Sequence, residues 1–85
     1  MISKQRQITW RDVERVLTRL GYVRHDVKGS HRVYRHEHAL MVVLPYRRMN
    51  SAVSELHLTA VQSTLANSGL LPPREFNAML LNGSN

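Results

Sequence analysis

The hydrophobic pattern of this 85-residue chain first changes its period at Gly21. Before this glycine, apolar residues recur at spacings of three and four, which places them on one face of a helix. They are Trp10, Val13, Leu17 and Leu20. After it, β-branched and aromatic residues predominate as far as Pro45, interrupted by the turn signals "KGS" and "HEHA", as is typical of short strands. The chain therefore has to combine a helix with a sheet.

The limits of the first helix follow from its flanking residues. Thr9 is a suitable N-cap, and Asp12, three residues later, completes a shortened capping box. Gly21 ends the helix as a C′ glycine. We therefore predict a helix over residues 10–20, with a solvent-facing stripe of Arg11, Arg15 and Arg19.

The strand-like region divides at its turn signals into three antiparallel strands. We predict them at about 22–27, 31–36 and 40–44, with Pro45 closing the third. A three-stranded meander needs a helix over one face to be stable, and the helix over 10–20 can supply it.

The remaining chain is predicted to be helical after a loop. Residues 47–57 have no clear period and are predicted to form that loop. Thr59 then caps a helix with Val61 and Leu65 facing inward, which ends at Gly69. A short helix over 74–81 buries Phe76 and Leu80.

This order of elements predicts an α+β fold: a helix, a three-stranded antiparallel sheet, a helix and a short C-terminal helix. Double-stranded-RNA-binding domains share the order, although a fold alone does not fix a function. We predict a single domain over residues 1–85, with a core of about 9–81. Because so short a chain buries only roughly 60–65% of its unfolded surface, any site has to be simple.

Charge is concentrated in the first part of the chain. The net charge is +6, and residues 1–48 contain eleven Lys and Arg against four acidic residues. Residues 49–85 contain only Arg74 against Glu55 and Glu75. A basic surface of this kind suits a polyanion, since binding to phosphates releases counterions. The alternative is a solvated basic surface without a partner.

Several classes of protein are disfavoured. The absence of cysteine excludes thiol nucleophiles, disulfides and cysteine zinc sites. The longest apolar run, residues 39–44, is far too short for a membrane span, and the polar start does not resemble a secretory signal. We expect a cytoplasmic protein that does not contact a membrane.

The stretch "KGSHRVYR" contains the first candidate for chemistry, His31. An unperturbed histidine titrates near neutral pH and can remove the proton of an RNA 2′-hydroxyl. Gly29 and Ser30 form a turn that a phosphate can approach, and Lys28 and Arg32 are placed to hold that phosphate. The alternative is a polar residue at a hairpin edge without a role.

Two further groups are candidates for RNA binding. Tyr34, together with Tyr22, lies among arginines that include Arg24, and aromatic rings among cations can stack on unpaired bases. A half-buried strand residue would give the same pattern. Arg47 and Arg48 resemble a phosphate clamp at a strand end, although a solvated loop would look alike.

The remaining histidines are His25, His36, His38 and His57. Imidazoles in "HEH" suggest a metal site, but the spacing matches no familiar ligand set and the segment falls where a turn is expected. We predict no metal site and no cofactor.

Several motifs together resemble a known family. A helix ending in "LGY", then "KGSH", "YRH", an apolar strand ending in proline and a helix ending in "SGL" are similar to the HicA toxins of bacterial toxin–antitoxin systems, from about Thr9 to Leu81. The resemblance implies a double-stranded-RNA-binding-like fold, metal-independent cleavage of mRNA and a HicB antitoxin that masks the active site. The catalytic histidine of the family's Gly-Ser-His motif carries over to His31.

The chain departs from the family after the third strand. Many relatives have a basic residue and then a histidine after the strand-ending proline, whereas here Pro45 precedes Tyr46, Arg47 and Arg48. A second histidine role is therefore missing, and the arginines are candidates to replace it as phosphate binders.

Three hypotheses follow: a toxin ribonuclease, a non-catalytic RNA-binding module that uses the same basic face, and a structural subunit that pairs with an acidic protein. In the first, His31 is the catalytic residue. Strict alternation would place it on the same face as Val33, an expected core residue, so we expect a turn or bulge that turns His31 toward solvent.

Overall fold

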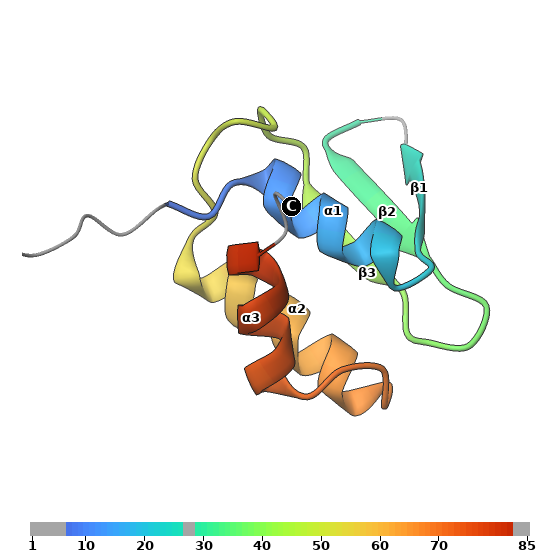
Figure 1. Ribbon diagram of the computed structural model, residues 1–85. Coiled ribbons are helices and arrows are strands. Elements are labelled where there is room, and N and C mark those ends of the chain that lie inside the picture. Colours follow the sequence, from blue (N-terminus) through green and yellow to red (C-terminus); the bar gives the residue numbers. More distant parts are fainter. Residues whose placement is uncertain (1–6, 27–28, 83–85) are drawn as a thin grey trace, which may run out of the picture.

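The computed structural model describes residues 7–26 and 29–82 and has the predicted α+β order. The element bounds are α1 (Trp10–Arg19), β1 (Val23–Asp26), β2 (His31–Arg35), β3 (Val42–Pro45), α2 (Glu55–Asn67) and α3 (Pro73–Asn82) (Figure 1). None of the helices in the described ranges is long and apolar enough to cross a membrane.

The sheet is an antiparallel meander with the strand order β1-β2-β3. In the β1–β2 pair His25 lies opposite Val33, and in the β2–β3 pair His31 lies opposite Pro45. All three helices lie on one side of the sheet (Figure 1). The sheet therefore has an inner face toward the helices and an outer face toward solvent.

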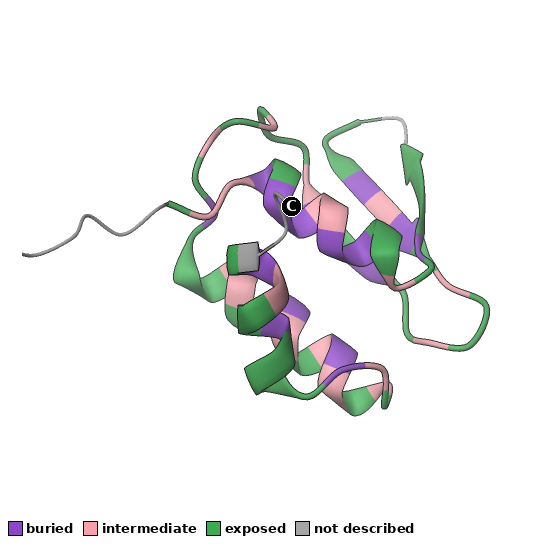
Figure 2. Cartoon of the chain, viewed as in Figure 1, coloured by how far each residue is buried: buried purple, intermediate pink, exposed green. Residues whose placement is uncertain are grey.

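The core lies between the inner face and the helices (Figure 2). Its fully buried side chains come from α1, α2 and α3 and include Leu17, Leu65 and Phe76. The predicted inward positions on the helices are thus confirmed for Val61, Leu65, Phe76 and Leu80.

Burial alternates along β2 and corrects one expectation. His31 and Arg35 are exposed, Arg32 and Tyr34 are buried, and Val33 is only partly buried. Val33 therefore shares the outer face with His31 and is not a core residue. No bulge is needed to expose His31. Tyr34 points inward, and because side chains alternate along a strand, His31 three residues earlier points outward.

Helix α1 begins with the predicted capping box. The Thr9 hydroxyl accepts from the Asp12 amide, and the Asp12 carboxylate accepts from the Thr9 amide at 2.9 Å. The helix ends at Arg19, with Leu20 as its C-cap, and Gly21 follows with a φ of +101°. Arg11 and Arg19 are exposed as predicted, whereas Arg15 is partly covered and forms an ion pair with Asp12.

Two predicted boundaries are wrong. Helix α2 begins at Glu55, inside the predicted loop, because Ser54 rather than Thr59 is its N-cap and accepts from the His57 amide at 3.3 Å. The first turn shows no apolar period because Leu56 points into solvent, with 78% of its surface exposed. Strand β3 begins at Val42 rather than at residue 40. The predicted end of the first strand at Val27 lies outside the described residues.

Candidate functional site

His31 begins β2 at one end of the sheet and faces outward. Its backbone pairs with Pro45, the last residue of β3. Within the described part of the chain the imidazole has no hydrogen bond and no ion pair. Both ring nitrogens are therefore accessible to a ligand.

The turn before His31 is bonded to the segment after β3. Gly29 has a φ of +118°, which side-chain-bearing residues rarely adopt, and open space surrounds its α-carbon. The Ser30 carbonyl accepts from the Tyr46 amide at 2.7 Å. The predicted role of Gly29 and Ser30 in shaping a turn fits this geometry, while Lys28 lies outside the described residues.

Arg32 is the unusual residue of this region because its guanidinium is buried. Only 6% of the residue is exposed, and the group lies 4.2 Å from the centre of the Tyr46 ring. Its Nη1 donates to the Arg47 carbonyl at 3.0 Å, whereas its buried Nε has no partner. Arg32 thus stabilises the segment after β3 through its contacts with Tyr46 and Arg47. Its guanidinium does not reach into solvent as a phosphate contact would.

No carboxylate among the described residues forms an ion pair with Arg32. Asp26 lies directly across from it in the β1–β2 register, but the Asp26 carboxylate pairs with Arg24 at 3.4 Å. The buried positive charge is therefore left without an acidic partner, which is an unfavourable arrangement in the absence of a ligand.

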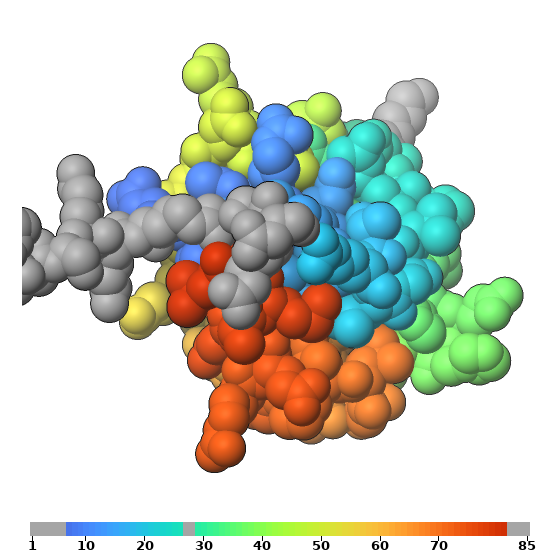
Figure 3. Space-filling model, in the orientation of Figure 1, coloured from blue at the N-terminus to red at the C-terminus, as the bar shows by residue number. Residues whose placement is uncertain are grey.

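The segment after β3 carries two exposed arginines on a loop that α1 holds in place. Arg47 and Arg48 are both exposed. The Arg11 amide donates to the Met49 carbonyl at 2.9 Å, and the Trp10 amide donates to the Ser51 carbonyl at 3.2 Å. The first turn of α1 thereby satisfies its own unpaired amides and anchors the loop. In the space-filling view this yellow-green segment projects from the molecular surface (Figure 3).

We call the group formed by His31, Arg32, Tyr46, Arg47 and Arg48 the His31 end of the sheet. It contains exposed arginines, an exposed ring and an unbonded imidazole, arranged on two backbone segments that are bonded to each other. Such a surface is suited to an anion and to an aromatic group at the same time.

Two predicted RNA contacts have other partners. Tyr34 is 3% exposed, and its hydroxyl donates to Glu14 Oε1 at 2.6 Å. Burial, together with this bond, raises the pKa of the Tyr34 hydroxyl. A buried ring offers no face to a base, which corrects the predicted stacking role of Tyr34. Tyr22 is likewise buried, and its hydroxyl donates to the Leu40 carbonyl at 2.8 Å.

Arg24 is exposed, but its charge is already paired. Its Nη1 lies 3.2 Å from Glu14 Oε1, and this carboxylate is the main cause of the raised pKa of the guanidinium. A phosphate at Arg24 would have to compete with Glu14 and Asp26. The structure thus does not bring Arg24 into the His31 end.

Of the other histidines, His36 and His57 have structural contacts, whereas His25 is exposed and, like His31, has no side-chain hydrogen bond within the described residues. His36 Nε2 bonds to the Leu20 carbonyl at 2.8 Å, and its Nδ1 accepts from the His38 amide at 2.9 Å. His57 Nδ1 bonds to the N-cap Ser54 at 2.9 Å, and its ring packs against Trp10. Within the described ranges, no three His, Cys, Asp or Glu side chains are grouped as metal ligands would be.

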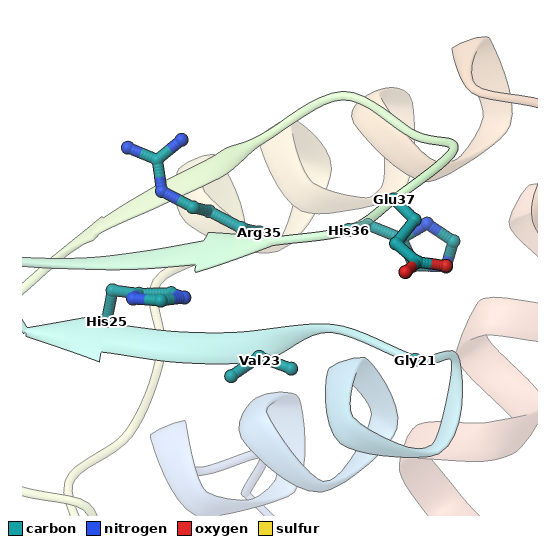
Figure 4. Close-up of a pocket in the computed structure, with 6 residues that line it drawn as sticks. All are labelled: Gly21, Val23, His25, Arg35, His36 and Glu37. Atoms are coloured by element: carbon teal, nitrogen blue, oxygen red, sulfur yellow. The ribbon is translucent and has the colours of Figure 1, made fainter.

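A hollow of about 560 Å³ opens at the other end of the β1–β2 pair. Figure 4 shows its lining residues spread along two strands, with His25 well separated from His36 and Glu37. Since both His36 nitrogens are already bonded within the protein, the polar groups of this hollow do not converge on one point.

Tyr46 is the residue of the His31 end that the sequence did not single out. A signal was present: it is an aromatic residue directly after a strand-ending proline and directly before two arginines. Its contact with Arg32 was not predictable, because arginine is ordinarily an exposed residue.

The fold and the His31 end together define a small basic α+β domain that presents one unbonded histidine and exposed arginines at a sheet end. Residues 10–48 match the family model described as the HicA toxin of bacterial toxin–antitoxin systems. This confirms the resemblance to a toxin of a toxin–antitoxin system over the region that holds α1, the sheet and both loop arginines. No curated protein and no solved structure matched the chain.

Proposed function

We propose that this protein is a toxin ribonuclease that cleaves mRNA without a metal ion and uses His31 as its single catalytic histidine. The observation that carries the proposal is the exposed His31 ring, unbonded within the described residues, at a sheet end that lies inside the matched toxin region. We further propose that residues 1–85 act as one cytoplasmic domain with a core of about 9–81.

The chemistry requires few groups. His31 removes the proton of a 2′-hydroxyl, and the 2′-oxygen forms a bond to the adjacent phosphorus while the bond from phosphorus to the 5′-oxygen breaks. The leaving 5′-oxygen takes a proton from solvent or from a protonated His31. The products are a 2′,3′-cyclic phosphate and a 5′-hydroxyl, and water balances the protons.

Arg47 and Arg48 are the proposed phosphate contacts, because both are exposed on the anchored loop next to β3. Positive charge near the reacting phosphate stabilises the charge that develops in the transition state. Gly29 and Ser30 shape the turn that leads to His31. Lys28, which precedes this turn in the sequence, is a further proposed phosphate contact.

The proposed partner is a HicB-type antitoxin that covers His31. The outer face of the sheet supports this choice, since Val23 and Val43 are exposed there and lie on the same face as His31. An acidic or apolar partner on this face would block a small cationic site sterically and electrostatically at once.

A cleavage assay tests the catalytic proposal. The purified protein is mixed with an mRNA, with and without EDTA, and His31→Ala is compared with His25→Ala. His25 is a matched control because it is exposed on the neighbouring strand. We expect loss of cleavage only in His31→Ala, and no effect of EDTA. Cleavage by His31→Ala would refute the role of His31, and inhibition by EDTA would refute the metal-free mechanism.

The alternative is a non-catalytic RNA-binding module that uses the same cationic loop. It predicts salt-dependent binding, intact RNA after long incubation and little effect of His31→Ala on affinity. Analysis of the RNA products in the same assay separates the two functions.

A further inference from the structure

We propose that Tyr46 is a stacking platform for one unpaired nucleobase beside His31, and that Arg32 positions its ring. This inference rests on the proposed action on RNA and adds the class of RNA that the site accepts: single-stranded segments or loops.

The ring has one supported face. The Arg32 guanidinium lies 4.2 Å from the ring centre, within the range of a cation–π contact, while 53% of Tyr46 remains exposed. An exposed aromatic ring ordinarily changes rotamer readily, whereas this ring rests on a side chain that is 6% exposed. The covered face is occupied by protein, so a ligand has the opposite face to stack on.

The backbone around the ring is fixed from two sides. The Tyr46 amide donates to the Ser30 carbonyl at 2.7 Å, and Arg32 donates to the Arg47 carbonyl at 3.0 Å. A platform held in place before the ligand arrives loses less conformational entropy when it binds. These two bonds also connect the platform to the turn that carries His31.

The position of Tyr46 relative to His31 places the bound base near the proposed cleavage site. His31 and Pro45 are cross-strand partners, which places their Cα atoms about 5 Å apart, and Tyr46 is the next residue. The Tyr46 ring itself rests on the inner-face residue Arg32, whereas His31 faces outward. The RNA strand therefore passes over the end of the sheet between the base on Tyr46 and the phosphate at His31.

The chemistry selects unpaired RNA. A base inside a duplex has both faces covered by its neighbours, whereas a base in a loop or a single strand can leave its stack and lie on an aromatic ring. The exposed Arg47 and Arg48 beside the platform are placed to follow the backbone of the same nucleotide.

The test measures binding, so that it does not depend on cleavage. The probe is a 2′-O-methyl oligoribonucleotide, which lacks the 2′-hydroxyl that cleavage requires, as a single strand, as a blunt duplex and with an abasic site at each position in turn. We expect Tyr46→Ala to weaken binding of the single strand by roughly 5- to 150-fold. Tyr46→Phe retains the ring and should bind like the wild type, and the duplex should be insensitive to both changes.

The abasic series separates stacking from a structural effect. In the wild type, one abasic position should weaken binding more than the others, and this difference should disappear in Tyr46→Ala. Tyr46→Leu keeps an apolar side chain without a ring and should lose the same difference. Arg32→Met should reduce the difference when Tyr46 is present and change nothing in the Tyr46→Ala background. A base-specific loss that persists in Tyr46→Ala, or equal binding by all variants, overturns the inference.

The two proposals fail in different ways. If unmodified RNA is bound through Tyr46 but is not cleaved, the ribonuclease proposal fails and the platform stands. If RNA is cleaved but neither Tyr46→Ala nor the abasic series has an effect, the platform fails and the ribonuclease proposal stands.

Discussion

The two ends of strand β2 each have a histidine, and the two differ in their contacts. His31, at the start of the strand, has an exposed ring without hydrogen bonds among the described residues. His36, directly after the strand, has both ring nitrogens bonded, to Leu20 and to His38. One histidine is available for chemistry, and the other connects the end of α1 to the turn after β2.

The arginines of the inner face show the same contrast. Arg24 pairs with Glu14 and Asp26, whereas the more deeply buried Arg32 has no carboxylate partner among the described residues. The comparison shows that, within the described residues, the arginine next to His31 lacks an acidic partner whereas Arg24 is paired with two carboxylates.

The largest expected effect is on RNA cleavage, which should depend on His31 and not on His36. His31→Ala should reduce RNA cleavage by about 100- to 10,000-fold, because a positioned acid–base group is lost. His36→Ala should leave cleavage within a few-fold of the wild type and lower the melting temperature. Cleavage rates and thermal unfolding of both variants check this, and the comparison fails if His36→Ala is the less active variant.

A second comparison is between Gly29, which precedes His31, and Gly21, which lies against His36. In Gly21→Ala the new Cβ would lie 3.1 Å from His36 Nε2, in addition to the strain of a φ of +101°. In Gly29→Ala only the backbone strain applies, because its surroundings are open. We expect both to lower the free energy of unfolding by about 1–3 kcal/mol, with Gly21→Ala the larger.

Urea unfolding of the two glycine variants measures the difference. RNA binding should reverse the order, since Gly29 lies in the turn next to His31 and Gly21 does not. A larger loss of binding in Gly21→Ala would contradict the assignment of the two ends.

The paired and unpaired arginines give a smaller effect on stability. Arg32→Met removes a buried charge without a carboxylate partner and should leave the free energy of unfolding unchanged or raise it by about 1 kcal/mol. Arg24→Met removes an exposed ion pair and should lower it by about 0.5 kcal/mol. Urea titrations compare the two, and a loss in Arg32→Met that exceeds the loss in Arg24→Met would show that the contacts of Arg32 with Arg47 and Tyr46 outweigh the cost of burying its charge.

The smallest effect appears only at alkaline pH. The pKa of the buried Tyr34 hydroxyl is raised, so the folded protein keeps its proton above about pH 10, where the unfolded chain loses it. The unfolded state then binds fewer protons, and stability falls as the pH rises, by up to about 1.4 kcal/mol per pH unit. Tyr34→Phe should show a weaker decline. If the free energy of unfolding fell equally with rising pH in the wild type and in Tyr34→Phe, the buried hydrogen bond between Tyr34 and Glu14 would be contradicted.

The sequence predicted α1 and the strand order because their signals are local. The capping box of Thr9 and Asp12 and the strand-ending Pro45 each lie next to the boundary that they define. The start of α2 was missed since the exposed Leu56 conceals the helical period of its first turn.

The site was only partly predictable. His31 was found through its motif, but the face on which it lies depends on whether Tyr34 or Val33 points inward. In the structure Tyr34 points inward, where its hydroxyl donates a hydrogen bond to Glu14 of α1, a contact between residues 20 positions apart. The Arg32–Tyr46 contact likewise depends on tertiary packing, which residue type and spacing do not specify.

The bonds between α1 and the loop after β3 have a consequence for how binding can be observed. The amides of Trp10 and Arg11 exchange with solvent only when the loop carbonyls of Ser51 and Met49 move away. A ligand that holds the loop in place slows that exchange, so these two amides report whether a ligand is bound. Hydrogen exchange at the first turn of α1 can therefore report whether a ligand is bound at the His31 end.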